Sequence, residues 1–175
     1  MKRLLAALAL LAASACAPSG GDAPVLTVTK STDITAPASR VWDIVKDFDA
    51  LNRWHPAVAK DEIVEGKNNV VGAVRVLTLG DGGTIKEKLL GYDANGRSLK
   101  YSILEGVLPV SSYESTLTVE ESGANASKVT WSGNFKRKDT GATPAAGADD
   151  ATATSTMESV YQAGLDNLKK MAEGQ

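Results

Sequence analysis

The chain has 175 residues, enough for one domain with a hydrophobic core. Its 19 basic and 21 acidic residues give a net charge of −2, which argues against a nucleic-acid-binding surface. It contains one histidine, His55, one cysteine, Cys16, and no GxSxG, HExxH or CxxC motif, so serine-triad and metal-dependent hydrolysis have little support. We predict no metal, no cofactor and no catalytic residue, and we expect His55 to be structural, as a lone histidine usually is.

The first 15 residues have the pattern of a secretory signal peptide. A basic start is followed by an apolar run over residues 4–13, which is too short to span a bilayer. Residues 11–16 resemble a bacterial lipobox, so we expect Cys16 to be lipidated and to become the mature N-terminus, with residues 16–24 as a tether. An ordinary signal peptide that releases a soluble periplasmic protein is the alternative.

The domain, residues 25–173, is expected to begin with a strand over residues 25–35 and a helix started by Pro37. A second short helix should cover residues 49–54, before Pro56. Period-two patterns between glycine, asparagine and aspartate turns predict six further strands, over residues 58–66, 72–79, 84–92, 99–104, 113–121 and 128–138.

After a loop of small residues over 140–150, an apolar stripe at helical spacing predicts a long closing helix. One amphipathic helix and seven strands favour an α+β fold in which a curved antiparallel sheet wraps around the helix. The residues of the stripe are Met157, Val160, Tyr161, Gly164, Leu165, Leu168 and Met171.

Glu87 lies on a strand face that should be apolar. Ile85, Glu87 and Leu89 alternate with Lys86 and Lys88, and because the lysines belong in water, Glu87 is expected to point inward. A buried carboxylate needs a partner, a water pocket or a function, since an unpaired buried charge is very costly. An ion pair with a lysine of a neighbouring strand, or a place at a wet sheet edge, is the alternative to a role in a cavity.

The same parity on the neighbouring strands gives a concave face that is mostly apolar and carries a few polar groups. This composition is typical of a small-molecule pocket, and equally of a core with a few satisfied polar atoms. The predicted pocket lining is Glu87, Tyr113, Ser115, Tyr101, Ile85, Leu89, Ile103, Leu117, Trp131 and Phe135.

The order of elements, with the segments 36–42, 48–49 and Trp54-His55-Pro56, resembles the helix-grip proteins over residues 27–172. These form the SRPBCC, or START/Bet v 1-like, superfamily, also described as polyketide cyclase/dehydrase-like; its fold hosts lipid carriers, hormone receptors, cyclases and accessory proteins. Against the plant abscisic-acid receptors of this superfamily, Glu87, Tyr113 and Ser115 match polar pocket positions. Ala59 stands in place of the lysine that holds the hormone's carboxylate, which argues against that hormone as the ligand. The gate and latch loops of those receptors imply a cavity mouth here, formed by Gly80, Asp81, Gly82, Gly83, Val107, Leu108 and Pro109.

Residues 54–60, 108–113, 115–119 and 164–169 look like the corresponding segments of MxaD-type methanol-oxidation accessory proteins. This resemblance implies a periplasmic location and a role beside a dehydrogenase and its cytochrome c.

Three functions are therefore open. The first is an exported, lipid-anchored protein that binds a small apolar or amphipathic molecule, and the second is an accessory protein that contacts a periplasmic dehydrogenase or cytochrome c. The third is an enzyme of cyclase or hydratase type that uses Glu87 with Tyr113. An open cavity favours the first, a filled interior with exposed apolar loop tips the second, and a carboxylate bonded to a tyrosine the third. We expect Glu87 to orient a ligand or water rather than to act as a general base.

Overall fold

The computed structural model describes residues 23–174. The predicted signal peptide, Cys16 and most of the predicted tether lie outside the described residues. Within residues 23–174, no helix is long and apolar enough to cross a membrane.

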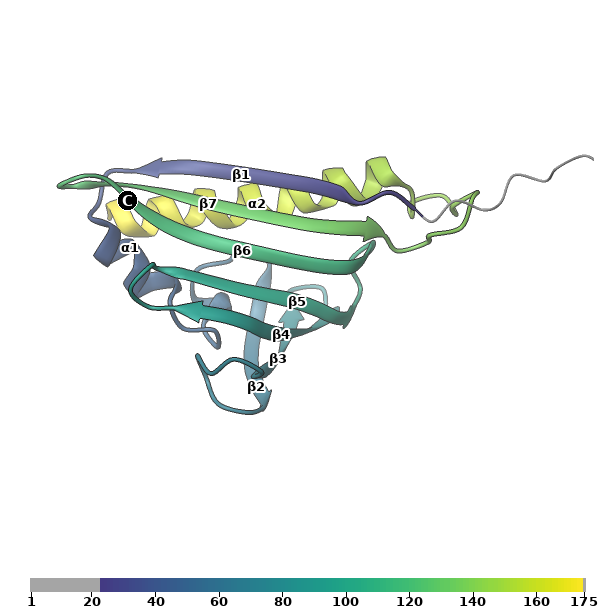
Figure 1. Cartoon of the computed structure of the whole chain (residues 1–175), viewed down its shortest axis with the longest axis horizontal. Helices are drawn as coiled ribbons and strands as arrows, with labels where there is room; N and C mark the ends of the chain where they lie inside the picture. The colour runs from purple at the N-terminus through teal and green to yellow at the C-terminus, as the bar shows by residue number, and fades with distance from the viewer. Residues whose placement is uncertain (1–22, 175) are drawn as a thin grey trace, which may run out of the picture.

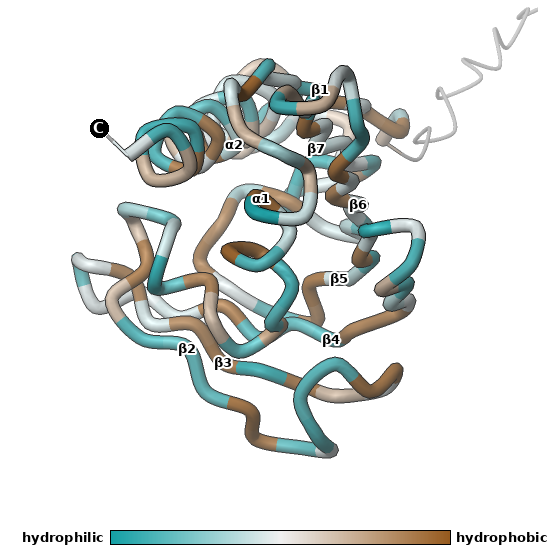
Figure 2. Tube along the Cα trace, turned by 90° about the vertical axis from the view of Figure 1, so that its left-hand side faces the viewer, coloured by the Kyte–Doolittle hydropathy of each residue, from teal (hydrophilic) through white to brown (hydrophobic). Residues whose placement is uncertain are grey.

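Seven strands form one antiparallel sheet in the order β1-β7-β6-β5-β4-β3-β2. The sheet curves, and the long helix α2 runs along β1 and β7 (Figure 1). Seen from the end, the strands follow an arc from β1 past β5 to β2 (Figure 2). The predicted helix-grip arrangement is thus confirmed. The elements are β1 (Leu26–Ile34), α1 (Ala38–Val45), η1 (Leu51–Arg53), β2 (Val58–Glu65), β3 (Val74–Leu79), β4 (Thr84–Asp93), β5 (Ser98–Gly106), β6 (Val110–Gly123), β7 (Ala126–Arg137) and α2 (Asp150–Glu173).

Most elements match the prediction within two residues at each end, and two differ in a way that has a clear cause. The second short helix is a single 3-10 turn, η1, because the chain turns into β2 soon after it. Strand β6 begins at Val110 rather than at residue 113, since Val110 pairs with Arg137 and Ser111 with Lys136 of β7.

The ends of α2 are fixed by local chemistry. The Asp149 side chain accepts a hydrogen bond from the Thr152 N–H, which satisfies a donor of the first turn. Gly174 ends the helix in the left-handed conformation, with φ of 75°. The predicted apolar stripe is correct over most of its length, but Met171 is 38% exposed and Ala172 is buried instead. Near its end, the helix therefore presents a smaller residue to the sheet.

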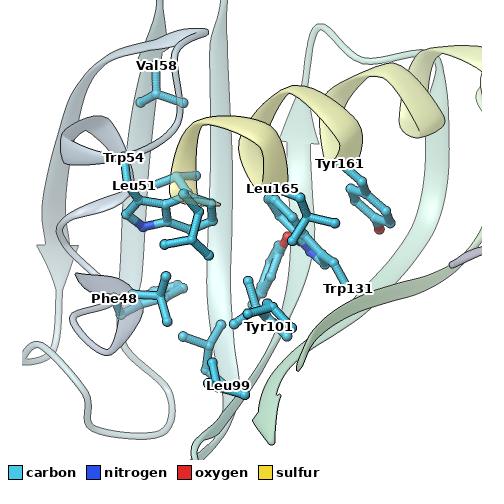
Figure 3. Packing of buried hydrophobic residues seen from close by; sticks show 14 of the residues in the cluster. Phe48, Leu51, Trp54, Val58, Leu99, Tyr101, Trp131, Tyr161 and Leu165 are labelled. Carbon is cyan, nitrogen blue, oxygen red and sulfur yellow. Dashed lines mark hydrogen bonds between the residues drawn. The ribbon is translucent and has the colours of Figure 1, made fainter. Parts of the chain in front are cut away.

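The core lies between α2, the sheet and the segment that follows α1. Figure 3 shows Phe48, Leu51 and Trp54 from that segment on one side, with Trp131 and Tyr161 beneath α2 on the other. The Trp131 and Tyr161 rings stack with their centroids 4.6 Å apart. This segment therefore closes the side of the core that α2 leaves uncovered.

Candidate ligand-binding site

A cavity of about 70 Å³ lies within this core. Its walls come from α2, from the segment after α1, from strands β2 to β7 and from the β5–β6 loop, and most of the lining side chains are apolar. The lining residues are Leu51, His55, Ala57, Val58, Leu77, Leu79, Ile85, Glu87, Tyr101, Ile103, Leu108, Tyr113, Trp131, Met157 and Val160.

The predicted pocket residues all share the inward face, but only part of the set reaches the cavity. Glu87, Tyr101, Tyr113, Ile85, Ile103 and Trp131 line it. Ser115, Leu89, Leu117 and Phe135 are buried in the packed core around it. Side-chain parity identifies the face of the sheet, whereas α2 determines where along that face space remains.

Glu87 is paired with an arginine. Arg75 of β3 lies directly opposite Glu87 of β4, and its Nε and Nη2 atoms donate to Glu87 Oε2 at 2.8 and 2.6 Å. Both side chains are almost fully buried. The partner is therefore an arginine, where the sequence raised the alternative of a lysine. Both bonds end on Oε2, so Oε1 of this cavity-lining residue takes no part in the pair with Arg75.

Arg75 also holds a second carboxylate and the segment after α1. Its Nη1 donates to Asp61 Oδ2 at 3.1 Å and to the Phe48 carbonyl, and its guanidinium carbon lies 4.1 Å from the centre of the Phe48 ring. Asp61 Oδ2 accepts from the Leu51 N–H as well, while Asp61 Oδ1 is buried with no hydrogen-bond partner among the described residues. One arginine thus faces two buried carboxylates, which leaves the cluster of Asp61, Arg75 and Glu87 with a net charge of −1 when all three are ionised.

The electrostatics of this cluster follow from that imbalance. Burial raises the pKa of Glu87, against the opposing effect of Arg75. Burial also raises the pKa of Asp61, and Asp49 adds to that rise. Burial by itself lowers the pKa of Arg75, but Glu87 and Asp61 together outweigh it and raise that pKa, so the guanidinium stays charged.

Sequence reasoning missed Arg75 and Asp61. Arg75 shares its strand parity with the buried Leu77. The alternation alone could therefore have predicted an inward-facing arginine on the strand before Glu87. The signal for Asp61 was weaker, because β2 is an edge strand and Ile63, which shares the parity of Asp61, is only partly buried.

A chain of hydrogen bonds crosses the core beside the cavity. Trp131 Nε1 lies 3.0 Å from Tyr101 Oη, which lies 3.4 Å from Tyr113 Oη. Tyr113 Oη is 2.6 Å from Tyr161 Oη, and Tyr161 Oη is 3.1 Å from Ser115 Oγ. The chain ends where Ser115 Oγ donates to the Ser132 carbonyl at 2.9 Å.

The direction of every bond in this chain is determined by its ends. An indole N–H can only donate and a carbonyl can only accept, and each hydroxyl has one proton to give. Tyr101 therefore donates to Tyr113, Tyr113 to Tyr161, and Tyr161 to Ser115. Burial raises the pKa of Tyr101 and Tyr113, and that of Tyr161 to about 12, so these hydroxyls stay protonated. All their protons are in use, and the cavity-lining Tyr101 and Tyr113 can offer a ligand only acceptor lone pairs.

His55 lines the cavity with both ring nitrogens occupied. The Ala57 N–H points at Nδ1 at 3.2 Å, so Nδ1 accepts and the Nε2–H donates to the Val160 carbonyl at 3.0 Å. Burial lowers the pKa of His55, which favours this neutral form. A Cβ at Gly164 would lie 2.7 Å from His55 Cδ2, so the close approach of α2 to this ring requires glycine. His55 therefore has a structural role that links the cavity wall to α2.

The predicted mouth loops touch each other. The Val107 N–H donates to the Thr84 carbonyl at 3.2 Å, and a Cβ at Gly83 would meet Val107 Cγ2 at 3.0 Å. Of the predicted mouth residues, Leu108 lines the cavity, whereas Gly80, Asp81, Gly82, Gly83, Val107 and Pro109 do not. Val107 is 54% exposed, and Leu104 near the end of β5 is 51% exposed. The two predicted mouth loops are therefore in contact with each other, and apolar side chains lie on their outer surface.

A surface groove of about 350 Å³ lies beside the β5–β6 loop of the predicted mouth. The β5–β6 ladder stops at the pair Ser102–Glu114, so residues 103–106 of β5 diverge from residues 110–113 of β6, and the groove lies between them. Ile103, Leu108 and Tyr113 line both the groove and the cavity. These three side chains are the wall between the interior and the surface.

Comparisons with known proteins agree with this architecture. An abscisic acid receptor of Arabidopsis thaliana is 32% identical over 91 residues, which are 50% of this chain and 47% of the receptor. The structure of the protein XoxI from Bacillus cereus is 31% identical, with a TM-score of 0.74, covering 83% of this chain and 94% of that one. The Zhui aromatase/cyclase from Streptomyces sp. R1128 shares the fold at 20% identity, with a TM-score of 0.68, over 86% of this chain and 94% of that one. The matched segment thus spans about half the length of the curated receptor.

The family model described as polyketide cyclase / dehydrase and lipid transport matches residues 25–173. That range includes every strand and helix described above. The resemblance to the SRPBCC superfamily is thereby confirmed, and the chain belongs to the polyketide cyclase/dehydrase and lipid transport family.

Proposed function

We propose that this protein binds a small apolar or amphipathic molecule in the cavity between α2 and the sheet. The observation that carries the proposal is the pairing of an apolar cavity with one buried carboxylate, Glu87, which is held by Arg75 and has Oε1 free of that pair. Ligand pockets combine apolar walls with a few placed polar groups in this way. The cavity of about 70 Å³ suits a small head group, and a longer ligand would need the wall of Ile103 and Leu108 to move toward the groove.

The test is to purify the protein from its own host and to identify bound small molecules by native mass spectrometry and solvent extraction. Ile103→Phe fills the wall of the cavity and should abolish the co-purified species. The matched control is Val64→Phe, at a half-exposed position of β2 that does not line the cavity. Absence of any bound molecule in the unmodified protein, or equal retention by both variants, would count against the proposal.

We also propose that the protein is exported and anchored by a lipid on Cys16, on the periplasmic face of a bacterial membrane. The support is the sequence of residues 1–16 alone. The mass of the mature N-terminal peptide tests this proposal, because a diacylated Cys16 and a free N-terminus at another residue have different masses. In the Cys16→Ser variant the protein should leave the membrane fraction.

A second candidate function is that of an accessory protein for a periplasmic alcohol-oxidising dehydrogenase or its cytochrome c. The likeness to XoxI and the exposed side chains of Leu104 and Val107 favour it. Binding to the purified dehydrogenase and cytochrome from the same host should then be weakened by Val107→Glu and unchanged by Val64→Glu. The enzyme hypothesis ranks lower, because Glu87 has an arginine partner and accepts from no tyrosine within residues 23–174.

A further inference from the structure

The polar atoms that face the cavity share one property: they accept hydrogen bonds. Tyr101 and Tyr113 have each given their proton to the next hydroxyl of the chain, and Glu87 Oε1 is a carboxylate oxygen. The Trp131 N–H is used by Tyr101, and the His55 Nε2–H by Val160. Among the described lining residues, no side-chain donor is left for a ligand.

The charged side chains around the cavity also favour a ligand that donates hydrogen bonds, because acidic groups outnumber basic ones there. Arg75 is the one buried cation of the cluster and faces both Glu87 and Asp61. Asp49 adds a third negative charge nearby, and His55 is held neutral by its two hydrogen bonds. With Glu87 and Asp61 both ionised around Arg75, a bound cation would therefore offset a net negative charge, whereas a bound anion would add to it.

From these two observations we infer that the ligand enters the cavity with a protonated amine: a small alkylammonium group whose N–H donors meet Glu87 Oε1 and the lone pairs of Tyr101 and Tyr113. This inference rests on the proposed function and adds the chemical class of the ligand. An ammonium has only donors, and the side chains that line the cavity, with Glu87 ionised, offer only acceptors. The short apolar part of the ligand would lie against Ile85, Ile103 and Met157.

The size of the cavity limits the head group. An apolar cavity of about 150 Å³ holds benzene, so a cavity about half that size suits roughly three to five non-hydrogen atoms. Propylammonium fits this limit, 1-propanol is its neutral isostere, and propionate is an anion of similar size. These three probes separate charge from shape.

The experiment titrates the full chain with propylammonium, 1-propanol and propionate, and follows the Trp131 indole N–H by NMR. A charge-assisted hydrogen bond is about twice as strong as a neutral one, so propylammonium should bind about tenfold or more tightly than 1-propanol, and propionate weakest. Equal or tighter binding of 1-propanol would overturn the amine assignment and leave the proposed function in place. Absence of binding by propylammonium would also overturn it, whereas the co-purification experiment decides the proposed function independently.

Two variants test the origin of the preference. Glu87→Gln removes the charge that touches the ligand and should bring the ratio of amine to alcohol affinity close to one. Asp61 does not line the cavity, so a fall in the same ratio in Asp61→Asn would report the charge of the cluster rather than a lost contact. The matched control, Glu62→Gln, changes an exposed carboxylate of the same strand and should leave the ratio unchanged. An unchanged ratio in a folded Glu87→Gln protein would refute the assigned site.

Discussion

Replacement of Arg75 by methionine should show how much one buried cation contributes to the stability of the fold. In the native protein, Arg75 contacts Glu87, Asp61, the Phe48 carbonyl and the Phe48 ring. Methionine fills similar volume but offers none of these hydrogen bonds. Two buried carboxylates then remain with no cation between them, together with a buried carbonyl that has lost a donor.

The expected cost is about 3–5 kcal/mol at pH 8, the range measured when one partner of a buried ion pair is removed. The loss of stability caused by Arg75→Met should be smaller at acidic pH. Without Arg75, the pKa of Glu87 and of Asp61 in the folded state rises further above the unfolded value. A raised carboxyl pKa contributes stability below the unfolded pKa, and that stability is lost as the pH rises through the folded pKa. The difference in the free energy of unfolding between wild type and variant should therefore be smaller at pH 5 than at pH 8.

Urea unfolding at both pH values measures this gap. The control is Lys100→Met, which breaks a half-exposed ion pair with Glu114 at 2.6 Å and should cost less than about 1 kcal/mol. A cost for Arg75→Met no larger than that of the control would contradict the reasoning, and so would a gap that stays constant between pH 8 and pH 5.

Two further changes test the core beside the cavity. Gly133→Ala places a methyl group against the Tyr161 hydroxyl and should cost about 1–3 kcal/mol, while Gly80→Ala, with open space around it, should cost little in the same thermal unfolding assay. A harmless Gly133→Ala would mean that the hydroxyl chain has room to shift. His55→Gln tests a pH dependence: because burial lowers the pKa of His55, the unfolded chain takes up a proton below pH 6.5 before the folded protein does. Wild-type stability should then fall on acidification, by at most about 1.4 kcal/mol per pH unit from this residue, and the variant should lack that slope. Parallel pH profiles for the two proteins would exclude His55 as the source.

The sequence predicted the fold well because each element has its own local pattern. Alternation determined which face of each strand is buried, and the buried positions of β6 and β7, among them Ser115 and Gly133, follow the predicted parity. Which of these inward-facing residues line the cavity could not be predicted from alternation alone. Leu89 and Phe135 have the correct parity but pack in the core, because contacts between α2 and the sheet join residues far apart in the chain. Tyr161 was expected only as part of an apolar stripe, and its hydrogen bonds to Tyr113 and Ser115 depend on that same packing.

The position of Glu87 could be predicted from the sequence, whereas its partner became clear only from the structure. Parity alone placed a carboxylate inside and left open whether it served a ligand or an ion pair. The structure shows the ion pair, in which Arg75 uses one carboxylate oxygen, and it places the same residue at the cavity wall, as the proposed ligand site requires. The hydroxyl chain adds what no strand pattern contains, because its direction depends on an indole N–H of Trp131 at one end and the carbonyl of Ser132 at the other. Both ends lie on β7, and between them the chain visits β5, β6 and α2. The acceptor character of the cavity is therefore a property of the packed sheet and helix together, and it persists as long as α2 keeps Tyr161 in contact with β6.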